Sequence, residues 1–279
     1  MQPLPRIPGY ELLQLLGGGP LTRVYSARDC AADTLCAVKL LREDWDDPQT
    51  AIKLLQREAR AGLTVRHARL VRVRDAHVTR PPYFLVMELL PGESARQRLD
   101  RDYRLETADV LWIIRQTAEA LAALHAAGFV HGDVKPENIR LTADGNAVLI
   151  DLGFAHRPGE NAAFLSQGYV LGTINYLAPE LCFPIPDGDF ASDVFSLGLT
   201  FYELLVGRLP YATESVADMF RLRREHRSGD FALRIGPPAL ARIIERLLAP
   251  QPAQRPRAAA LVPQLVALEI NTLKQRRSA

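Results

Sequence analysis

The chain has 279 residues, of which 48% are hydrophobic and 24% charged, a composition typical of a globular protein with a sizeable core. Its formal net charge of +2 is spread along the sequence, which argues against the strongly basic surface that nucleic-acid binding needs. The longest strongly apolar run, residues 195–206, contains Glu203 and is far shorter than the roughly 20 residues that span a bilayer. We therefore expect no nucleic acid and no membrane as a partner of this chain.

Two features bear on the cellular compartment. The three cysteines, Cys30, Cys36 and Cys182, have no metal-ligand spacing and cannot all pair within the chain, which favours reduced thiols. The start of the sequence, MQPLPRIPGY, has neither the charged nor the apolar region of a signal peptide. The sequence thus predicts a cytoplasmic protein.

The N-terminal third of the chain has the pattern of a β-sheet with one helix. Short apolar runs separated by turn residues predict strands at 10–16, 23–27, 35–41, 71–77 and 83–89. Between the third and fourth strands, Ile52, Leu55, Ala59 and Leu63 recur at helical spacing. Asp47-Pro48 is a suitable start for this helix, because proline is tolerated in the first helical turn.

After Pro91-Gly92 the pattern becomes mainly helical. Apolar periodicity predicts helices at 107–127, 193–206 and 238–248, and residues 140–150 predict a hairpin that turns at Asp144-Gly145. Residues 271–279 are typical of a frayed tail or the start of a linker. The expected fold class is α+β, with a small β-rich lobe containing one main helix and a larger, mostly helical lobe.

A glycine-rich turn separates the first two predicted strands. It reads Leu16-Gly17-Gly18-Gly19-Pro20-Leu21-Thr22-Arg23-Val24. Glycines let the backbone come close to a phosphate, whose oxygens can then accept hydrogen bonds from amide N–H groups. An ordinary hairpin turn explains the same glycines about as well, so this motif alone indicates little.

Lys39, at the end of the predicted strand Ala37-Val38-Lys39, and Glu58, on the helix, form a candidate ion pair. A lysine after a buried strand usually has a side chain that simply reaches solvent. In a nucleotide site, however, it can hold phosphates. Glu58 lies beside the apolar positions of its helix and therefore faces inward, where a carboxylate needs a partner. A pair between the two residues satisfies both.

The most specific motif is His-Gly-Asp-Val-Lys-Pro-Glu-Asn at residues 131–138, followed by Asp-Leu-Gly at 151–153. Phosphoryl transfer needs a carboxylate that orients the attacking hydroxyl, ligands for a metal, and a cation that neutralises developing charge. Asp133 can take the first role, Asn138 and Asp151 the second, and Lys135 the third. A polar loop and hairpin without a site is a much weaker explanation. The acid, the cation, the amide and the second acid follow one another in an order that phosphoryl transfer can use.

Together these motifs resemble the eukaryotic-type (Hanks-type) serine/threonine protein kinases, including their bacterial members. The resemblance implies the bilobal protein-kinase-like fold: an N-terminal extension (1–9), a kinase domain (10–268, with its N-lobe at 10–90 and C-lobe at 91–268) and a C-terminal tail (269–279). It implies a signalling enzyme that moves the γ-phosphoryl group of ATP, with Mg²⁺ or Mn²⁺, onto protein Ser/Thr hydroxyls. Protein substrates and a cognate phosphatase are the partners that it implies.

The resemblance also assigns roles to individual residues. Asp133 and Lys135 are catalytic, and Asn138 and Asp151 bind the metal. The nucleotide-binding residues are Leu16, Gly17, Gly18, Gly19, Pro20, Leu21, Thr22, Arg23, Val24, Ala37, Lys39, Glu58, Met87, Glu88 and Leu90. Met87 corresponds to the gatekeeper, and residues 88–90 to the hinge whose backbone faces adenine.

Three further residues match structural positions of the family. Glu180, in Ala178-Pro179-Glu180 at the end of the activation segment, is expected to pair with Arg255. Asp193 is expected to brace the catalytic loop.

Four departures from the family pattern remain: Thr22 for the third glycine, Gly132 for an arginine, Leu152 for a phenylalanine, and Arg140 for an apolar residue beneath adenine. In the family the arginine at position 132 helps to hold a phosphorylated residue of the activation segment. We therefore hypothesise that activity here does not depend on phosphorylation of that segment.

Two alternative functions belong to different classes. His-Gly-Asp with an asparagine five positions on also resembles aminoglycoside and choline phosphotransferases, but Lys135 and Ala178-Pro179-Glu180 favour a protein kinase. The departures at 22, 132 and 152 invite a pseudokinase, a binding module without catalysis. Retention of the groups that bind nucleotide and metal argues against it.

Overall fold

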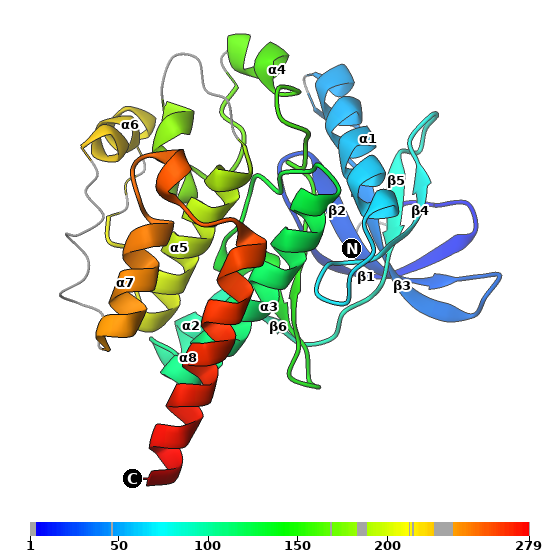
Figure 1. Cartoon of the computed structure of the whole chain (residues 1–279). Helices are drawn as coiled ribbons and strands as arrows, with labels where there is room; N and C mark the ends of the chain where they lie inside the picture. Colours follow the sequence, from blue (N-terminus) through cyan, green and yellow to red (C-terminus); the bar gives the residue numbers. More distant parts are fainter. Residues whose placement is uncertain are drawn as a thin grey trace. The chain divides into compact units, whose positions relative to one another are not determined.

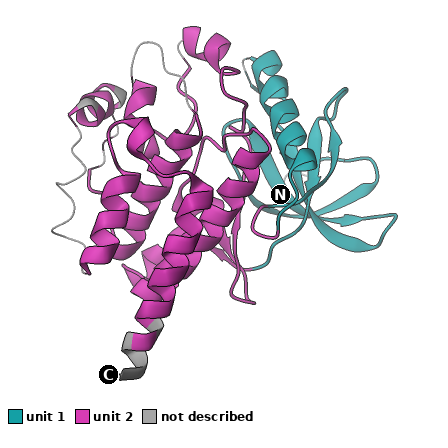
Figure 2. Cartoon of the chain, in the orientation of Figure 1, with its two compact units in different colours: residues 1–67, 71–91 teal, residues 68–70, 92–279 magenta. Residues whose placement is uncertain are grey.

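The computed structural model describes residues 4–45, 47–167, 169–182, 189–211, 213, 215–225 and 237–278. The chain forms two compact units (Figure 2): unit 1 comprises residues 1–67 and 71–91, and unit 2 comprises residues 68–70 and 92–279. Unit 1 is rich in β-structure and unit 2 is mostly helical (Figure 1), which confirms the expected fold class. Among the described residues, no helix is both long and apolar enough to cross a membrane.

Unit 1 contains a five-stranded antiparallel sheet in the order β1-β2-β3-β5-β4. Its elements are β1 (Tyr10–Gly18), β2 (Thr22–Asp29), β3 (Thr34–Leu41), α1 (Pro48–Thr64), β4 (Val73–His77) and β5 (Phe84–Met87). α1 begins where the sequence predicts, because the Asp47 side chain accepts a hydrogen bond from the Thr50 N–H at 3.2 Å and Pro48 follows it.

The two faces of this sheet bury different clusters. Tyr25, Ala27, Val38, Phe84 and Val86 lie in one cluster. The other face packs against α1, in a cluster of Leu41, Ala51, Leu55, Ala59 and Leu85. Burial of each large apolar side chain contributes about 1.5–3 kcal/mol, so α1 is held firmly on the sheet.

Unit 2 combines a small sheet, β6-β7-β8, with helices from residue 95 onward. Its elements are β6 (Glu93–Ser94), α2 (Ala95–Asp102), α3 (Thr107–Ala126), η1 (Pro136–Asn138), β7 (Ile139–Leu141), β8 (Ala147–Leu149), α4 (Ala162–Ser166), η2 (Ile174–Tyr176), η3 (Pro179–Cys182), α5 (Phe190–Val206), α6 (Val216–Arg224), α7 (Pro238–Leu247), η5 (Pro252–Gln254) and α8 (Ala258–Ser278). α3 and α5 carry fully buried side chains such as Leu111, Ile114, Phe195 and Phe201 and form the core against which the site is built.

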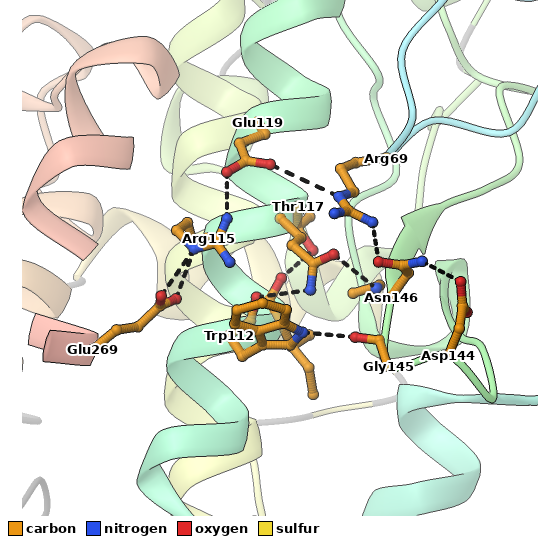
Figure 3. A network of polar contacts seen from close by, with 12 residues as sticks. Arg69, Trp112, Arg115, Thr117, Glu119, Asp144, Gly145, Asn146 and Glu269 are labelled. Carbon is orange, nitrogen blue, oxygen red and sulfur yellow. Dashed lines mark hydrogen bonds and ion pairs between the residues drawn. The ribbon is translucent and has the colours of Figure 1, made fainter. Parts of the chain in front are cut away.

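A polar network ties four parts of unit 2 together (Figure 3). Arg115 on α3 bonds Glu269 on α8 at 2.8 Å and also pairs with Glu119. Glu119 contacts Arg69, which belongs to the short segment 68–70, and Arg69 donates to Asn146 in the β7–β8 turn. The last helix, the core helix, this segment and the hairpin are therefore fixed relative to one another within the unit.

The structure differs from the sequence prediction at several boundaries. α5 begins three residues earlier than expected, because Asp189 accepts a hydrogen bond from the Ala191 N–H at 2.7 Å and caps the helix. Residues 271–278, expected to be frayed, continue α8, and Ala279 lies outside the described residues. The helices α2, α4, α6 and α8 were not predicted from the sequence.

Candidate active site

The glycine-rich turn is a tight hairpin between β1 and β2. The Gly19 N–H donates to the Thr22 carbonyl at 3.0 Å, and Arg23 Nη1 donates to the Gly19 carbonyl at 2.9 Å. A Cβ atom on Gly18 would lie 2.4 Å from the Thr22 carbonyl oxygen, so the turn itself requires that glycine. Gly17 and Gly19 are different, since a Cβ on either would meet no described atom within 4 Å. Packing does not require these two glycines, and both leave open space that a ligand can enter.

Several predicted nucleotide-binding residues share one face of the sheet. Val24 pairs with Lys39, and Ala37 pairs with Met87, across neighbouring strands. Residues directly opposite in an antiparallel ladder point to the same face, and Ala37 and Lys39 are two positions apart on one strand. Leu21 packs against the cluster of Leu41 and Leu85 beneath α1, which lies on this same face.

Lys39 and Glu58 form the ion pair that the sequence predicts. Lys39 Nζ lies 2.8 Å from Glu58 Oε1, and the two residues are only 6% and 2% exposed. The pair lies on the face of the sheet that α1 covers. Lys39 and Leu41 are two positions apart on β3 and therefore point to the same side, where Leu41 packs against α1. A buried lysine needs such a partner, and the carboxylate holds its ammonium group in one place.

The hinge residues follow β5. Met87, the last residue of the strand, is 8% exposed. The Glu88 N–H donates to the Arg72 carbonyl at 3.0 Å, and Glu88 Oε1 accepts from the Arg72 N–H at 2.7 Å. The N–H and one carboxylate oxygen of Glu88 are thus engaged within unit 1. Leu90, like Glu88, is half-buried.

In unit 2, Asp193 of α5 holds the start of the catalytic loop, as the sequence predicts. Its Oδ2 accepts from the His131 N–H at 2.7 Å and its Oδ1 accepts from the Gly132 N–H at 2.9 Å. His125 Nε2 lies 2.9 Å from Oδ2. Burial by itself would raise the pKa of Asp193, but the hydrogen bond from His125, the charge of the two histidines and the His131 N–H hold that pKa below its ordinary value.

Asp133 is 4% exposed and accepts hydrogen bonds at both carboxylate oxygens. Oδ1 accepts from the Thr173 hydroxyl at 2.6 Å and from the Thr173 N–H at 2.9 Å. Oδ2 lies 2.9 Å from Asn138 Nδ2 and 2.7 Å from Lys135 Nζ. Lys135 Nζ also donates to the Thr173 hydroxyl oxygen. A carboxylate, a hydroxyl and an ammonium group are therefore in mutual contact.

Asn138 and Asp151 are joined through the backbone. The Ile150 N–H donates to the Asn138 carbonyl at 2.8 Å, and Asp151 follows directly, with a positive φ of 64°. Because Asn138 Nδ2 faces Asp133, its Oδ1 is the atom suited to a cation. An amide oxygen with a carboxylate is the kind of donor set that Mg²⁺ accepts, usually with waters and phosphate oxygens completing the shell. The residues present fit a divalent metal.

The end of the activation segment is anchored by an arginine. Arg255 Nη1 and Nη2 bond Glu180 Oε1 and Oε2 at 2.6 and 2.7 Å, a bidentate pair that the sequence predicts.

Arg140 lies on β7 opposite Ser94, and burial lowers the pKa of its guanidinium although nearby Glu93 opposes this effect.

Sequence reasoning missed one part of the site, the contacts of Arg96 with three other residues. Arg96 bonds Glu137, Tyr176 and Glu203 and so joins α2, η1, η2 and α5. Arg96 lies in a polar stretch, ARQRLDRD, that has no apolar periodicity and so gave no signal for α2 or for its contacts.

Comparison with known proteins agrees with this geometry. The protein kinase domain family matches residues 10–265. PknD, a serine/threonine-protein kinase of Mycobacterium tuberculosis, is 34% identical over 249 residues, which are 88% of this chain and 37% of PknD. PrkC of Bacillus subtilis is 32% identical over 218 residues (77% of this chain, 33% of PrkC), and PkaB of Streptomyces coelicolor is 35% identical over 264 residues (92% and 62%).

A two-unit fold of this kind, with a lysine–glutamate pair in one unit and an Asp-Lys-Asn loop in the other, defines the protein kinase class. The chain belongs to the protein kinase family, and its relatives are bacterial Hanks-type serine/threonine kinases. It spans less than two thirds of the length of these three relatives.

Proposed function

We propose that the chain is a serine/threonine protein kinase domain, spanning residues 10–268, that transfers the γ-phosphoryl group of ATP to protein hydroxyls. The observation that carries the proposal is the contact between Asp133, Lys135 and Thr173. A hydroxyl already donates to Asp133 Oδ1 at 2.6 Å while Lys135 Nζ contacts both groups. This is the arrangement that an acceptor hydroxyl needs before it attacks a phosphorus atom.

In the reaction, the acceptor oxygen forms a bond to the γ-phosphorus as the bond to the β,γ-bridging oxygen breaks and ADP leaves. Asp133 orients the acceptor hydroxyl and receives its proton. Lys135 neutralises negative charge on the group in transfer. Because positioning and charge stabilisation supply nearly all of the rate in such a reaction, the firm hold on Asp133 is the central feature.

Asn138 and Asp151 are the residues that would hold Mg²⁺ or Mn²⁺. When bound there, a divalent cation neutralises phosphate oxygens and fixes the orientation of the triphosphate. The amide of Asn138 does two things in this arrangement, since Nδ2 bonds Asp133 and Oδ1 faces away from it. Metal binding and the orientation of Asp133 are therefore linked through one side chain.

Unit 1 supplies the nucleotide contacts. Backbone N–H groups of the turn at 16–24 bind phosphate oxygens, and Lys39, held by Glu58, binds the α- and β-phosphates. Val24, Ala37 and Met87 give an apolar surface for the adenine ring, and the 88–90 backbone provides its polar contacts.

The substrates are proteins, by the family resemblance, and a cognate phosphatase reverses the modification. We place the reaction in the cytoplasm, where ATP is abundant and where the thiols of Cys30, Cys36 and Cys182 stay reduced.

The test is a phosphotransfer assay with radiolabelled ATP, Mg²⁺ and myelin basic protein as acceptor. The native chain is expected to label serine and threonine residues, and Asp133→Asn is expected to label none above background. Aminoglycosides and choline serve as alternative acceptors in parallel reactions. Transfer only to a small molecule, or no transfer together with unaltered ATP binding in calorimetry, would overturn the proposal.

A further inference from the structure

Arg96 makes contacts that the reaction described above does not use. It lies in the first turn of α2, and its Nε donates to Glu137 Oε1 at 2.8 Å. Its Nη2 donates to Glu203 Oε1 at 2.7 Å and to the Tyr176 hydroxyl oxygen at 2.9 Å. The Tyr176 hydroxyl itself donates to Glu203 Oε2 at 2.5 Å. One guanidinium group therefore contacts residues of η1, η2 and α5.

These contacts are partly buried. Tyr176 is 5% and Glu203 4% exposed. Burial, and then the carboxylates of Glu203 and Glu137, raise the pKa of Tyr176, so its hydroxyl keeps its proton and remains a donor. Burial acts to lower the pKa of Arg96, but Glu203 more than offsets it and the pKa is raised. The raised pKa values mean that Arg96 and Tyr176 both keep their protons at physiological pH.

A well-formed cap fixes the place of Arg96. The Ser94 side chain accepts from the Gln97 N–H at 3.1 Å, and the Gln97 side chain accepts from the Ser94 N–H at 2.8 Å. This reciprocal capping box secures the first turn of α2, which is the turn that carries Arg96. Its guanidinium consequently acts from a rigid support.

Two routes lead from Arg96 to the two oxygens of Asp133. Glu137 is bonded through its peptide to Asn138, whose Nδ2 bonds Asp133 Oδ2 at 2.9 Å. Tyr176 donates its backbone N–H to the Thr173 carbonyl at 2.9 Å, and Thr173 bonds Asp133 Oδ1 through both its N–H and its hydroxyl. Each carboxylate oxygen is thus held by a residue, Asn138 or Thr173, that is joined directly to a residue that Arg96 contacts.

We propose that Arg96 is a positioning residue for Asp133, and this rests on the proposed kinase function. By holding Glu137 and Tyr176 at the same time, it sets the distance between the turn that carries Asn138 and the turn that carries Thr173. Loss of Arg96 lets the two turns move apart, so that Asp133 is no longer held from both sides. The effect acts on the transfer step, because none of these contacts is with a nucleotide-binding residue of unit 1.

The matched control is Arg98, two residues further along the same helix. It also makes two ion pairs, to Asp102 Oδ2 at 3.0 Å and to Asp109 Oδ2 at 3.1 Å, but neither partner adjoins a residue that holds Asp133. Arg96→Met leaves Glu203 buried without its cation, which lowers stability. The double variant Arg96→Met/Glu203→Gln removes that unpaired charge and separates stability from positioning.

Kinetics give the first measurement. Arg96→Met and the double variant are expected to lower kcat about tenfold, with KM for ATP changed by less than about twofold. Arg98→Met should keep the native kcat, and Arg96→Lys, which cannot bridge three partners, should fall between. Recovery of both kcat and the melting temperature in the double variant would show a purely structural role and overturn the proposal.

Hydrogen exchange gives a second measurement that needs no activity. The N–H groups of Thr173 and Tyr176 should exchange faster in Arg96→Met and in the double variant than in Arg98→Met, measured on a peptide covering 169–177. Equal exchange in all variants would overturn the positioning role. If the native chain transfers no phosphate to any acceptor, the proposed function fails, and the exchange result alone then decides whether Arg96 holds these turns.

Discussion

The two units hold their reactive groups in different ways. In unit 1, an ion pair of Lys39 with Glu58 joins a strand to the helix packed on it. In unit 2, Asp133 contacts Lys135, Asn138 and Thr173 directly, and Asp193 holds the loop that carries it. The first contact joins one strand to one helix, whereas the second belongs to a network that draws on several elements.

The difference has an energetic consequence. A substitution at Lys39 or Glu58 acts first on the contact between β3 and α1. In a network, each group polarises and orients the next, and the loss of one member changes several contacts at once. We therefore expect unit 2 to be the more sensitive to conservative substitution.

The largest effect is expected for Asp133→Asn. An asparagine fills the same space but cannot accept the proton of the acceptor hydroxyl, and its NH₂ group would face Thr173 or Lys135, both of which donate to the native carboxylate. We expect kcat to fall by about 10² to 10⁴-fold, the usual contribution of a general base. Steady-state kinetics with a protein acceptor would measure it, with a thermal melt as the control for folding. Near-native kcat in a folded variant would contradict the role of Asp133.

Lys39→Met is expected to have the next largest effect, about a hundredfold in kcat/KM, because it removes one cation that acts on the phosphates. The matched variant is Glu58→Gln, which keeps the lysine but weakens its partner and should cost less. Assays of both single variants and the double variant form a cycle. If Glu58→Gln lowers the rate as much as Lys39→Met does, the glutamate has a role beyond holding the lysine.

Much of this arrangement can be predicted from sequence, and the exceptions share a cause. Lys39 with Glu58 and Glu180 with Arg255 are predictable because each lies in a recognisable motif or on a clear periodic pattern. The Arg96 network is not predictable, because its four members, Arg96 included, come from four elements far apart in the sequence. The hydrophobic pattern of the sequence indicates which face of an element is apolar. It does not indicate which polar groups meet when elements pack.

Helix boundaries illustrate the same limit. α5 starts at a cap, Asp189, that lies before the apolar run, whereas the pattern indicates only where that run begins. α8 contains Pro263, which usually argues against a helix interior, and packing against α3 overrides that preference. Tertiary contacts therefore decide what local propensity leaves open.

A smaller effect, on stability, is expected at Asp193. The pKa of this carboxyl is below its ordinary value in the folded chain, so its contribution to stability is present above the unfolded pKa of about 3.9. It is lost as pH falls through the lower folded pKa. Asp193→Asn should cost about 2 kcal/mol at pH 7, since it removes a charged acceptor from the His131 and Gly132 N–H groups.

Urea unfolding between pH 7 and pH 2 measures this difference. Other carboxylates also titrate in that range, so the gap between the native chain and Asp193→Asn is the quantity to follow. The gap should narrow as the pH falls. A gap that stays constant would contradict the assignment of a lowered pKa to Asp193.

The smallest effect is expected when phosphate is removed from the activation segment. Gly132 stands where the family has an arginine, and its φ of +80° disfavours any side chain. A Cβ atom there would lie 2.8 Å from the Phe154 carbonyl oxygen, so the backbone around this position is built for glycine. The chain thus lacks, at this position, the cation that would bind a phosphorylated residue and order the segment.

Contacts between side chains anchor the end of the segment. Thr173 bonds Asp133, Tyr176 bonds Glu203 and Glu180 bonds Arg255, so the stretch that presents the acceptor is anchored at three points. Treatment with a phosphatase should therefore change the initial rate by less than about twofold. Ser166→Ala should have as small an effect, because the Ser166 hydroxyl donates to the Ala163 carbonyl at 2.9 Å within its own helix. A drop of about tenfold or more, equivalent to about 1.4 kcal/mol in the barrier and reversed by preincubation with ATP, would show that phosphorylation does order this segment.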